Sequence, residues 1–208
     1  MIVDLRDYTT APQARELLIE RCEREFFPEQ ARLGARFIGV FRDADNPDRF
    51  VWLRGMPDLE TRQRVLTAFY SDGEIWKAAR DEVNRWIADS DNVLLLRAAS
   101  GWAVDVDASR EAAAPSVVGM YTYVSRTPIA DAVALLREVA QEIERVGGRL
   151  LVTLATDPVE NNYPRHAIRT GETGFVWFAS FAPEQDCKLR LDGVEQRRLL
   201  PTAQSWLR

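Results

Sequence analysis

Three predicted strands of this 208-residue chain are apolar at nearly every position. They cover residues 93–96, 150–154 and 175–178. A strand of an antiparallel sheet with one face in water alternates apolar and polar residues, and these strands do not. Helices of the same unit can cover one face of such a sheet. A second sheet is the best cover for the other face, so we expect a closed or nearly closed barrel with helices outside.

The first hundred residues predict the element order β-α-β-β-α-β, which is the ferredoxin-like arrangement. A helical stripe of apolar residues runs from Ala14 to Phe26 at a spacing of four, and we expect this helix to end near Pro28. A second helical stretch begins at Pro57 and is broken at Asp72 and Gly73. The predicted strands cover residues 2–8, 36–41, 50–54 and 92–97.

The same pattern starts again after a linker predicted at residues 101–115, which is rich in Ala, Ser and Asp and carries a short strand at residues 102–106. A predicted helix at residues 129–143 ends at two glycines. We expect a short helix from Pro183 as well. The remaining predicted strands cover residues 117–124, 149–155, 175–178 and 196–200.

The two halves correspond closely at one point, because Phe50-Val51-Trp52-Leu53 in the first half matches Phe175-Val176-Trp177-Phe178 in the second. Both segments follow a polar loop that contains Asn and Pro, and both precede a proline. We therefore predict an α+β chain of tandem ferredoxin-like repeats, residues 1–100 and 116–208, whose antiparallel sheets pair into one barrel.

Composition and sequence pattern limit the kinds of partner that we expect for the chain. The net charge is −5 and no basic stripe is present, so we expect no nucleic acid partner. The N-terminus lacks the pattern of a signal peptide and no apolar run would span a bilayer, so we expect a cytoplasmic protein without a membrane partner. Cys22 and Cys187 lie far apart and we expect free thiols. One histidine and two scattered cysteines do not predict a metal site.

Residues 50–58 (FVWLRGMPD), followed by Phe69-Tyr70 and Trp76-Lys77, resemble the NIPSNAP family. Further matching segments follow in the same order at residues 90–95, 160–165, 176–178 and 199–203. The resemblance implies the dimeric α/β-barrel fold, with the pair formed within one chain as a monomeric pseudo-dimer or between chains as a homodimer. Relatives in that superfamily include monooxygenases of antibiotic biosynthesis and haem enzymes. Most members of the NIPSNAP family itself lack an assigned chemistry.

The polar loop at residues 160–166 holds the candidate catalytic groups. His166 can act as a general acid or base, Arg165 can hold an anionic oxygen, and Tyr163 can donate a proton. The alternative is a solvated hairpin loop shaped by its Asn and Pro residues. His166 could also ligate haem iron, although the haem enzymes of this superfamily use a histidine from a helix.

The candidate substrate-binding residues are aromatic and basic side chains on predicted strands and one predicted helix. They are Trp52, Trp76, Lys77, Arg80, Tyr121, Tyr123 and Trp177. The aromatic residues can instead fill a core, and the basic ones can lie on a solvated helix face.

We hypothesise a small-molecule pocket within the barrel for an apolar, aromatic or polyketide-like metabolite. Its reaction would be a cofactor-independent proton transfer, cyclisation or oxygenation, and no P-loop, GxGxxG or HExxH motif suggests another chemistry. The alternatives are a non-catalytic interaction or scaffold protein and a haem-dependent enzyme.

Overall fold

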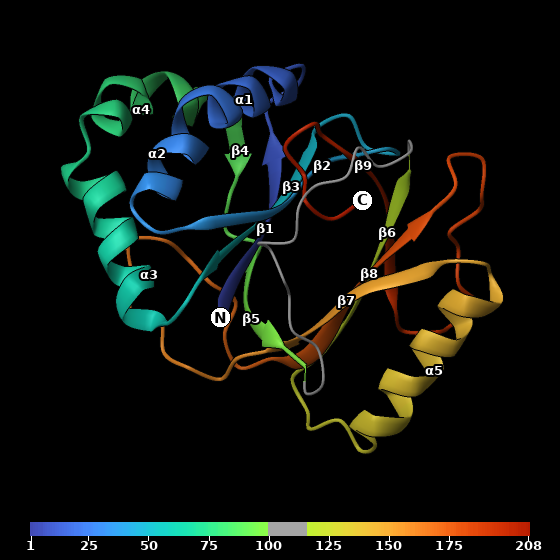
Figure 1. Ribbon diagram of the computed structural model, residues 1–208. Coiled ribbons are helices and arrows are strands. Elements are labelled where there is room, and N and C mark those ends of the chain that lie inside the picture. The colour runs from blue at the N-terminus through green and yellow to red at the C-terminus, as the bar shows by residue number, and fades with distance from the viewer. Residues whose placement is uncertain (100–115) are drawn as a thin grey trace.

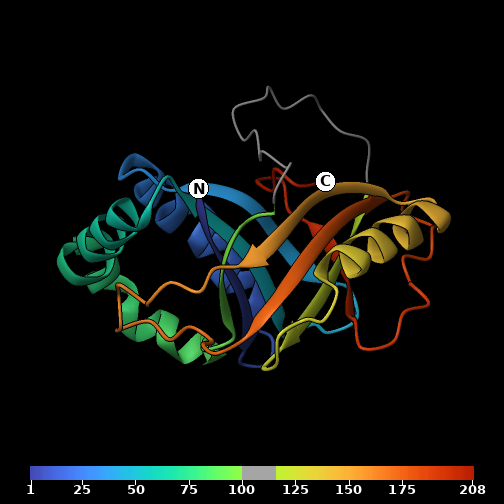
Figure 2. The ribbon, with the colours of Figure 1, turned by 90° about the horizontal axis from the view of Figure 1, so that it is seen from below.

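Eight antiparallel strands close into a barrel in the computed structural model, which describes residues 1–99 and 116–208 (Figures 1 and 2). The linker predicted at residues 101–115 and the strand predicted at residues 102–106 lie outside the described residues. Helices α1 to α4 cover the sheet of the first half, and α5 covers that of the second (Figure 1). No helix of the described segments is long and apolar enough to cross a membrane.

Each half contributes four strands in the same spatial order. The first half is ordered β5-β1-β3-β2 and the second β7-β8-β6-β9, both of which are the ferredoxin-like order. The barrel closes where β2 pairs with β9 and β5 pairs with β7. The origin of the halves by duplication stays a prediction. The strand bounds are β1 Ile2–Thr10, β2 Arg36–Asp43, β3 Arg49–Met56, β5 Val93–Ala98, β6 Val117–Ser125, β7 Arg149–Thr156, β8 Thr173–Phe181 and β9 Glu195–Pro201, with a short strand β4 Ile87–Asp89 beside β1.

The helices of the first half are interrupted by two π-helical turns, Cys22–Phe26 and Thr67–Asp72. The prediction that the first helix ends near Pro28 is wrong, because the helical path continues to Arg32. Within the preceding π-helical turn the N–H of Phe27 bonds to the carbonyl of Cys22, five residues back. Pro28 therefore lies in the first turn of a new α-helix, where a missing N–H costs little. The helix bounds are α1 Arg15–Arg21, α2 Phe27–Arg32, α3 Leu59–Leu66, α4 Glu74–Trp86 and α5 Ala132–Arg145.

The helix predicted from Pro183 is wrong, because the segment between β8 and β9 consists of turns. The Asp186 carboxylate accepts from the N–H of Lys188, and Gly193 has a φ of 75°. Such side-chain-to-backbone bonds and left-handed glycines favour turns over a helix. Apolar residues of this loop pack on the second sheet where a helix was expected; they are Cys187, Leu189 and Val194.

Packed apolar side chains fill the barrel interior. Every strand of the barrel contributes, and Phe41 stacks on Phe178 across it with ring centroids 6.0 Å apart. An eight-stranded barrel leaves room for little more than its own side chains. The strands that are apolar on both faces are thus covered as expected. The expectation of a ligand pocket within the barrel is wrong, because the side chains themselves occupy that space.

We expect Phe178→Ala to lower the free energy of unfolding by about 3–5 kcal/mol, because it leaves a cavity that the barrel cannot close. Phe175→Ala is the matched control, since Phe175 lies on the same strand but is only partly buried on the outer face. Phe175→Ala should lower the free energy of unfolding by less than half as much. Urea unfolding of both variants measures the difference, and equal losses would contradict a packed interior.

Candidate functional site

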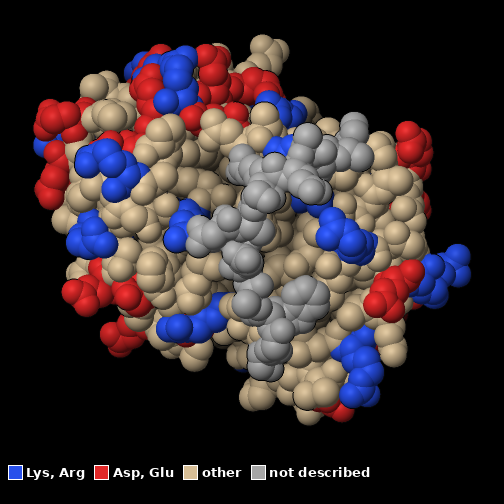
Figure 3. All heavy atoms as spheres, viewed as in Figure 1, with Lys and Arg blue, Asp and Glu red and all other residues tan. Residues whose placement is uncertain are grey.

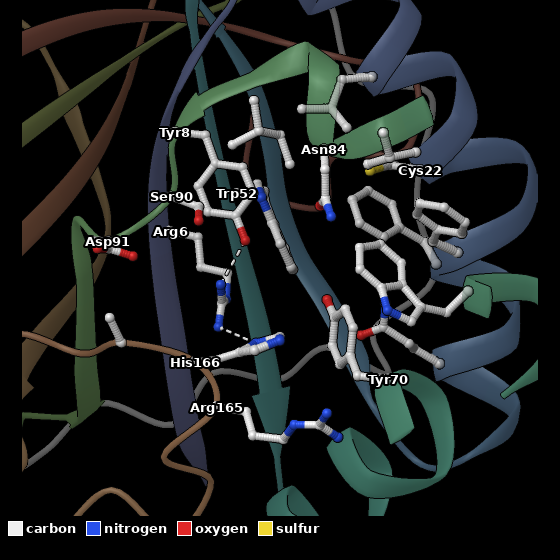
Figure 4. Close-up of a pocket in the computed structure, with 18 residues that line it drawn as sticks. Arg6, Tyr8, Cys22, Trp52, Tyr70, Asn84, Ser90, Asp91, Arg165 and His166 are labelled. Carbon is white, nitrogen blue, oxygen red and sulfur yellow. Dashed lines mark hydrogen bonds between the residues drawn. The ribbon is translucent and has the colours of Figure 1, made fainter. Parts of the chain in front are cut away.

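A cavity of about 220 Å³ lies outside the barrel, between the first half's sheet and its helices (Figure 4). Its floor is formed by β1 and β3, and its walls by α1, α2, α4 and both π-helical turns. The loop between β7 and β8 of the second half adds residues 165–167. The same loop is seen crossing towards α3 and α4 in Figures 1 and 2. Both halves of the chain therefore build one pocket.

Most of the pocket wall is apolar and aromatic. Trp52 on β3 packs against Phe27 with ring centroids 5.3 Å apart, and Trp76 on α4 packs against Phe26 at 5.7 Å. Such walls present flat faces to a bound molecule and favour an aromatic or planar ligand. The other apolar lining residues are Leu18, Cys22, Val83, Ile87 and Ala167.

Polar groups gather at one end of the pocket around Arg6, which is only 2% exposed. The Arg6 guanidinium donates to the Tyr8 hydroxyl at 2.5 Å and to Nδ1 of His166 at 3.0 Å (Figure 4). Tyr70 lies on the other side of His166, with ring centroids 4.2 Å apart. The hydroxyl of Tyr70 makes no hydrogen bond within the described residues, so it is free for a ligand.

His166 is held in one neutral form by these contacts. Arginine only donates hydrogen bonds, so Nδ1 must accept and the proton lies on Nε2. Burial lowers the pKa of His166, and the charges of Arg6 and Arg54 lower it further, to about 2. Burial raises the pKa of Tyr8 to about 12 against the opposing charge of Arg6. Both groups therefore offer hydrogen-bond donors near neutral pH, and His166 is not a general base in this arrangement.

Beneath the pocket lies a buried ion network in which Asp4, Arg54 and Arg62 are all fully buried. The Asp4 carboxylate accepts from Arg54 at 2.6 Å and from Arg62 at 2.8 Å. Gln30 accepts from Arg54 at 2.5 Å. Burial alone would raise the pKa of Asp4, but these arginines and Arg6 hold it well below its usual range. The network joins β1 to β3, α2 and α3.

The loop that carries His166 is fastened to this network. The Arg62 guanidinium donates to Oδ1 of Asn162 at 2.7 Å, and the Asn162 amide donates to the carbonyl of Leu59 at 2.5 Å. The Asn161 amide donates to the His166 carbonyl at 2.7 Å. Buried, charge-assisted bonds of this kind hold a loop in a defined position.

Four of the predicted site residues meet at this pocket: Trp52, Trp76, Arg165 and His166. Tyr163 lies behind His166, with ring centroids 5.2 Å apart, and its hydroxyl is 3.0 Å from Oγ of Ser71. Arg165 donates to the same Oγ at 2.9 Å. Tyr163 thus anchors the loop and is not among the residues that line the cavity.

Lys77 and Arg80 are exposed residues of α4 and do not line the pocket. Nζ of Lys77 pairs with Glu74 at 2.8 Å, and the Arg80 guanidinium lies 3.4 Å from Asp81. Asn84, on the same helix, does line the cavity. Trp76 and Asn84 of α4 thus contribute to the pocket wall, whereas Lys77 and Arg80 do not.

Tyr121, Tyr123 and Trp177 lie in the second half, where the corresponding region is filled. Tyr121 pairs with Trp177 across the strands, as Arg6 pairs with Trp52. The Tyr121 hydroxyl donates to the carbonyl of Cys187 at 2.5 Å, and both Tyr121 and Trp177 are fully buried. These residues pack on α5 and the turn segment as a core and line none of the pocket above.

Asp4, Arg6, Tyr8, Arg54 and Arg62 were not among the predicted site residues. Asp4, Arg6 and Tyr8 alternate with apolar residues on one strand, a pattern that is typical of a solvated face. Arg54 on β3 pairs with Asp4 in the sheet register. The available signal was a set of opposite charges on one side of two strands of a chain whose other strands are apolar.

His166 does not fit the role of a haem ligand. A histidine binds haem iron through a ring nitrogen with a free lone pair, and His166 is the only histidine of the chain. Its Nδ1 lone pair is taken by Arg6, and Nε2 carries the proton. Within the described residues no group of three or more His, Cys, Asp or Glu side chains could hold a metal ion.

A family model described as NIPSNAP matches residues 3–100. No curated protein matches the chain. An anthrone oxidase-like protein of solved structure shares 15% identity at a TM-score of 0.56, covering 97% of this chain and 91% of its own. A proposed monooxygenase from Lactobacillus acidophilus NCFM shares 13% identity at a TM-score of 0.54, covering 96% and 93%. An uncharacterised NIPSNAP domain protein from Burkholderia xenovorans shares 16% identity at a TM-score of 0.44, covering 50% and 99%. At these identities the two full-length neighbours show the fold, a barrel of the dimeric α/β type.

The depressed pKa of His166 predicts a specific pH dependence of stability. Below its ordinary pKa of 6.5 the unfolded chain binds a proton at His166 that the folded chain does not bind, so the free energy of unfolding falls as the pH falls. His166→Gln removes the titrating imidazole but keeps a side-chain acceptor for Arg6. The free energy of unfolding of the unsubstituted protein should exceed that of this variant by less at about pH 5 than at about pH 8. The decrease in this difference should reach about 2 kcal/mol at most. Urea unfolding at both pH values measures it, and a constant difference would show that His166 titrates normally.

Proposed function

We propose that the pocket binds a small, flat, mainly apolar molecule and polarises one oxygen atom of it, in a chain whose residues 3–100 match the NIPSNAP family model. The matched segment supplies every wall of the pocket except residues 165–167. We also propose that the chain is a tandem of ferredoxin-like units, residues 1–100 and 116–208. One chain then supplies the barrel that a pair of single units would form.

The convergence of donors at one end of an aromatic pocket carries this proposal. Arg6, the hydroxyl of Tyr8 and the Nε2–H of His166 lie together, and none of them can take up a proton near neutral pH. Fixed donors in a site sheltered from water stabilise negative charge that develops on a carbonyl or hydroxyl oxygen. These three donors are suited to binding an enolate or phenolate oxygen of the ligand. The role that follows for His166 is that of a neutral donor to such an oxygen.

The size of the cavity limits the ligand. Pockets for drug-sized molecules have volumes of about 300–1,000 Å³, whereas an apolar cavity of about 150 Å³ accommodates benzene. A cavity of about 220 Å³ therefore suits one or two rings. A full polycyclic polyketide would exceed it.

Blocking the pocket from its rim tests the proposal. Asn84 lines the cavity but is exposed, so Asn84→Trp should fill the opening without disturbing the core. With 2-naphthol as the probe, we expect calorimetric titration to show saturable binding to the unsubstituted protein. The Asn84→Trp variant should bind at least tenfold more weakly.

Arg85→Trp is the matched control, because Arg85 is the next residue of α4, is exposed and does not line the cavity. It should bind the probe as the unsubstituted protein does. Equal binding by both Trp variants would place the probe elsewhere. If neither 2-naphthol nor other one- and two-ring aromatic probes bind to the unsubstituted protein, the proposed function is wrong.

A further inference from the structure

Three buried arginines face one buried aspartate beside the pocket. Arg54, Arg62 and Asp4 are fully buried, and Arg6 is 2% exposed. Arginine stays charged, and its neighbours keep Asp4 ionised, so these four residues carry a net charge of about +2. The molecular surface offers no such excess over α1 and α4, where acidic and basic side chains intermingle in ion pairs such as Arg24 with Glu20 at 2.7 Å (Figure 3).

The excess positive charge lies mainly on Arg6. Asp4 binds Arg54 and Arg62 directly, and Arg62 has further partners in Asn161 and Asn162. Arg6 donates only to the Tyr8 hydroxyl and the His166 imidazole, and both of these groups are neutral. Among the described residues, no carboxylate forms an ion pair with Arg6. Asp91 also lines the cavity, but it is exposed and Figure 4 shows it well apart from the Arg6 guanidinium.

A buried cation without an anionic partner is costly, because neutral donors and acceptors replace only part of its hydration. Aromatic rings offset some of that cost. The Arg6 guanidinium lies 5.5 Å from the Trp52 ring and 5.7 Å from the Tyr8 ring. Neither ring contributes a full negative charge. An anion bound in the cavity would supply the negative charge that Arg6 lacks.

We infer that the ligand of this pocket binds as an anion, with Arg6 as its counter-ion. The inference rests on the proposed function and adds the charge of the ligand. The terminal nitrogens of Arg6 keep N–H groups beyond those used by Tyr8 and His166, since a guanidinium carries five. The ligand class is a one- or two-ring molecule with an anionic oxygen, either a carboxylate or an ionised hydroxyl.

A phenol that changes colour on ionisation tests the ionised hydroxyl. The phenolate of 4-nitrophenol absorbs visible light and the neutral phenol does not. The pocket should bind the phenolate at least tenfold more tightly than the phenol, which lowers the apparent pKa of the bound probe by at least one unit. Absorbance titrations across pH with saturating protein measure this shift. A bound probe with an unchanged or raised pKa would exclude an ionised hydroxyl as the anion and leave the carboxylate to be tested.

A matched pair of probes tests the carboxylate. 2-Naphthoate and 2-naphthamide have nearly the same shape and differ in charge. We expect calorimetry to show at least tenfold tighter binding of the naphthoate. A preference confined to naphthoate or to 4-nitrophenolate would identify the class of anion, and either result supports the inference. Equal binding of naphthoate and naphthamide, with no shift for 4-nitrophenol, overturns it and leaves the proposed function standing. Failure of every probe to bind would overturn both.

Substitution of Arg6 tests whether this residue causes the preference for anionic probes. Arg6→Met should abolish both preferences, and Arg6→Lys should keep part of them because it keeps the charge. Arg137→Met is the matched control, since Arg137 lies exposed on α5 of the second half. It should behave as the unsubstituted protein does. Loss of an unpaired buried charge should leave Arg6→Met folded, which urea unfolding checks. Anion preference that survives in folded Arg6→Met would contradict the assignment.

Discussion

The carboxylate of Asp4 is the contact on which the site depends. It holds Arg54 on β3 and Arg62 on α3, and Arg62 in turn holds Asn162 of the second half. The loop fixed in this way delivers His166 to Arg6, which lies two residues from Asp4 on the same strand. Removing one partner of a buried charge network leaves the others unpaired, so the pocket floor and its covering loop share one support.

The electrostatics of the site follow from that support. Positive charge gathers beneath the cavity because three arginines lie near a single carboxylate that pairs with only two of them, and burial together with this charge keeps His166 neutral. A neutral imidazole with its proton on Nε2 is a donor at any pH near 7. Neither His166 nor Tyr8 can take a proton from a ligand there, so these two residues are suited to stabilising an anion and not to forming one by deprotonation.

The strands and their closure into a barrel could be predicted, because segments such as residues 93–96 are apolar on both faces and need a second sheet. The polar floor of the pocket could not. Asp4, Arg6 and Tyr8 alternate with apolar residues as on a solvated face, and only pairing with Arg54, Arg62 and the helices shows that they are buried. Pro28 and Pro183 failed as boundary signals for local reasons, one lying after a π-helical turn and the other opening a segment whose side chains favour turns.

Joining two barrel halves in one chain lets them take different roles. In the first half Asp4 faces Arg54 and Arg6 faces Trp52; at the matching positions of the second half Gly119 faces Ala179 and Tyr121 faces Trp177. The second half thereby lacks the charged floor, and its aromatic residues pack as a core. Its contribution is the loop with His166, which covers the pocket of the first half. Two identical subunits would have to keep both sites alike, whereas in this chain each half is free to lose what the other supplies.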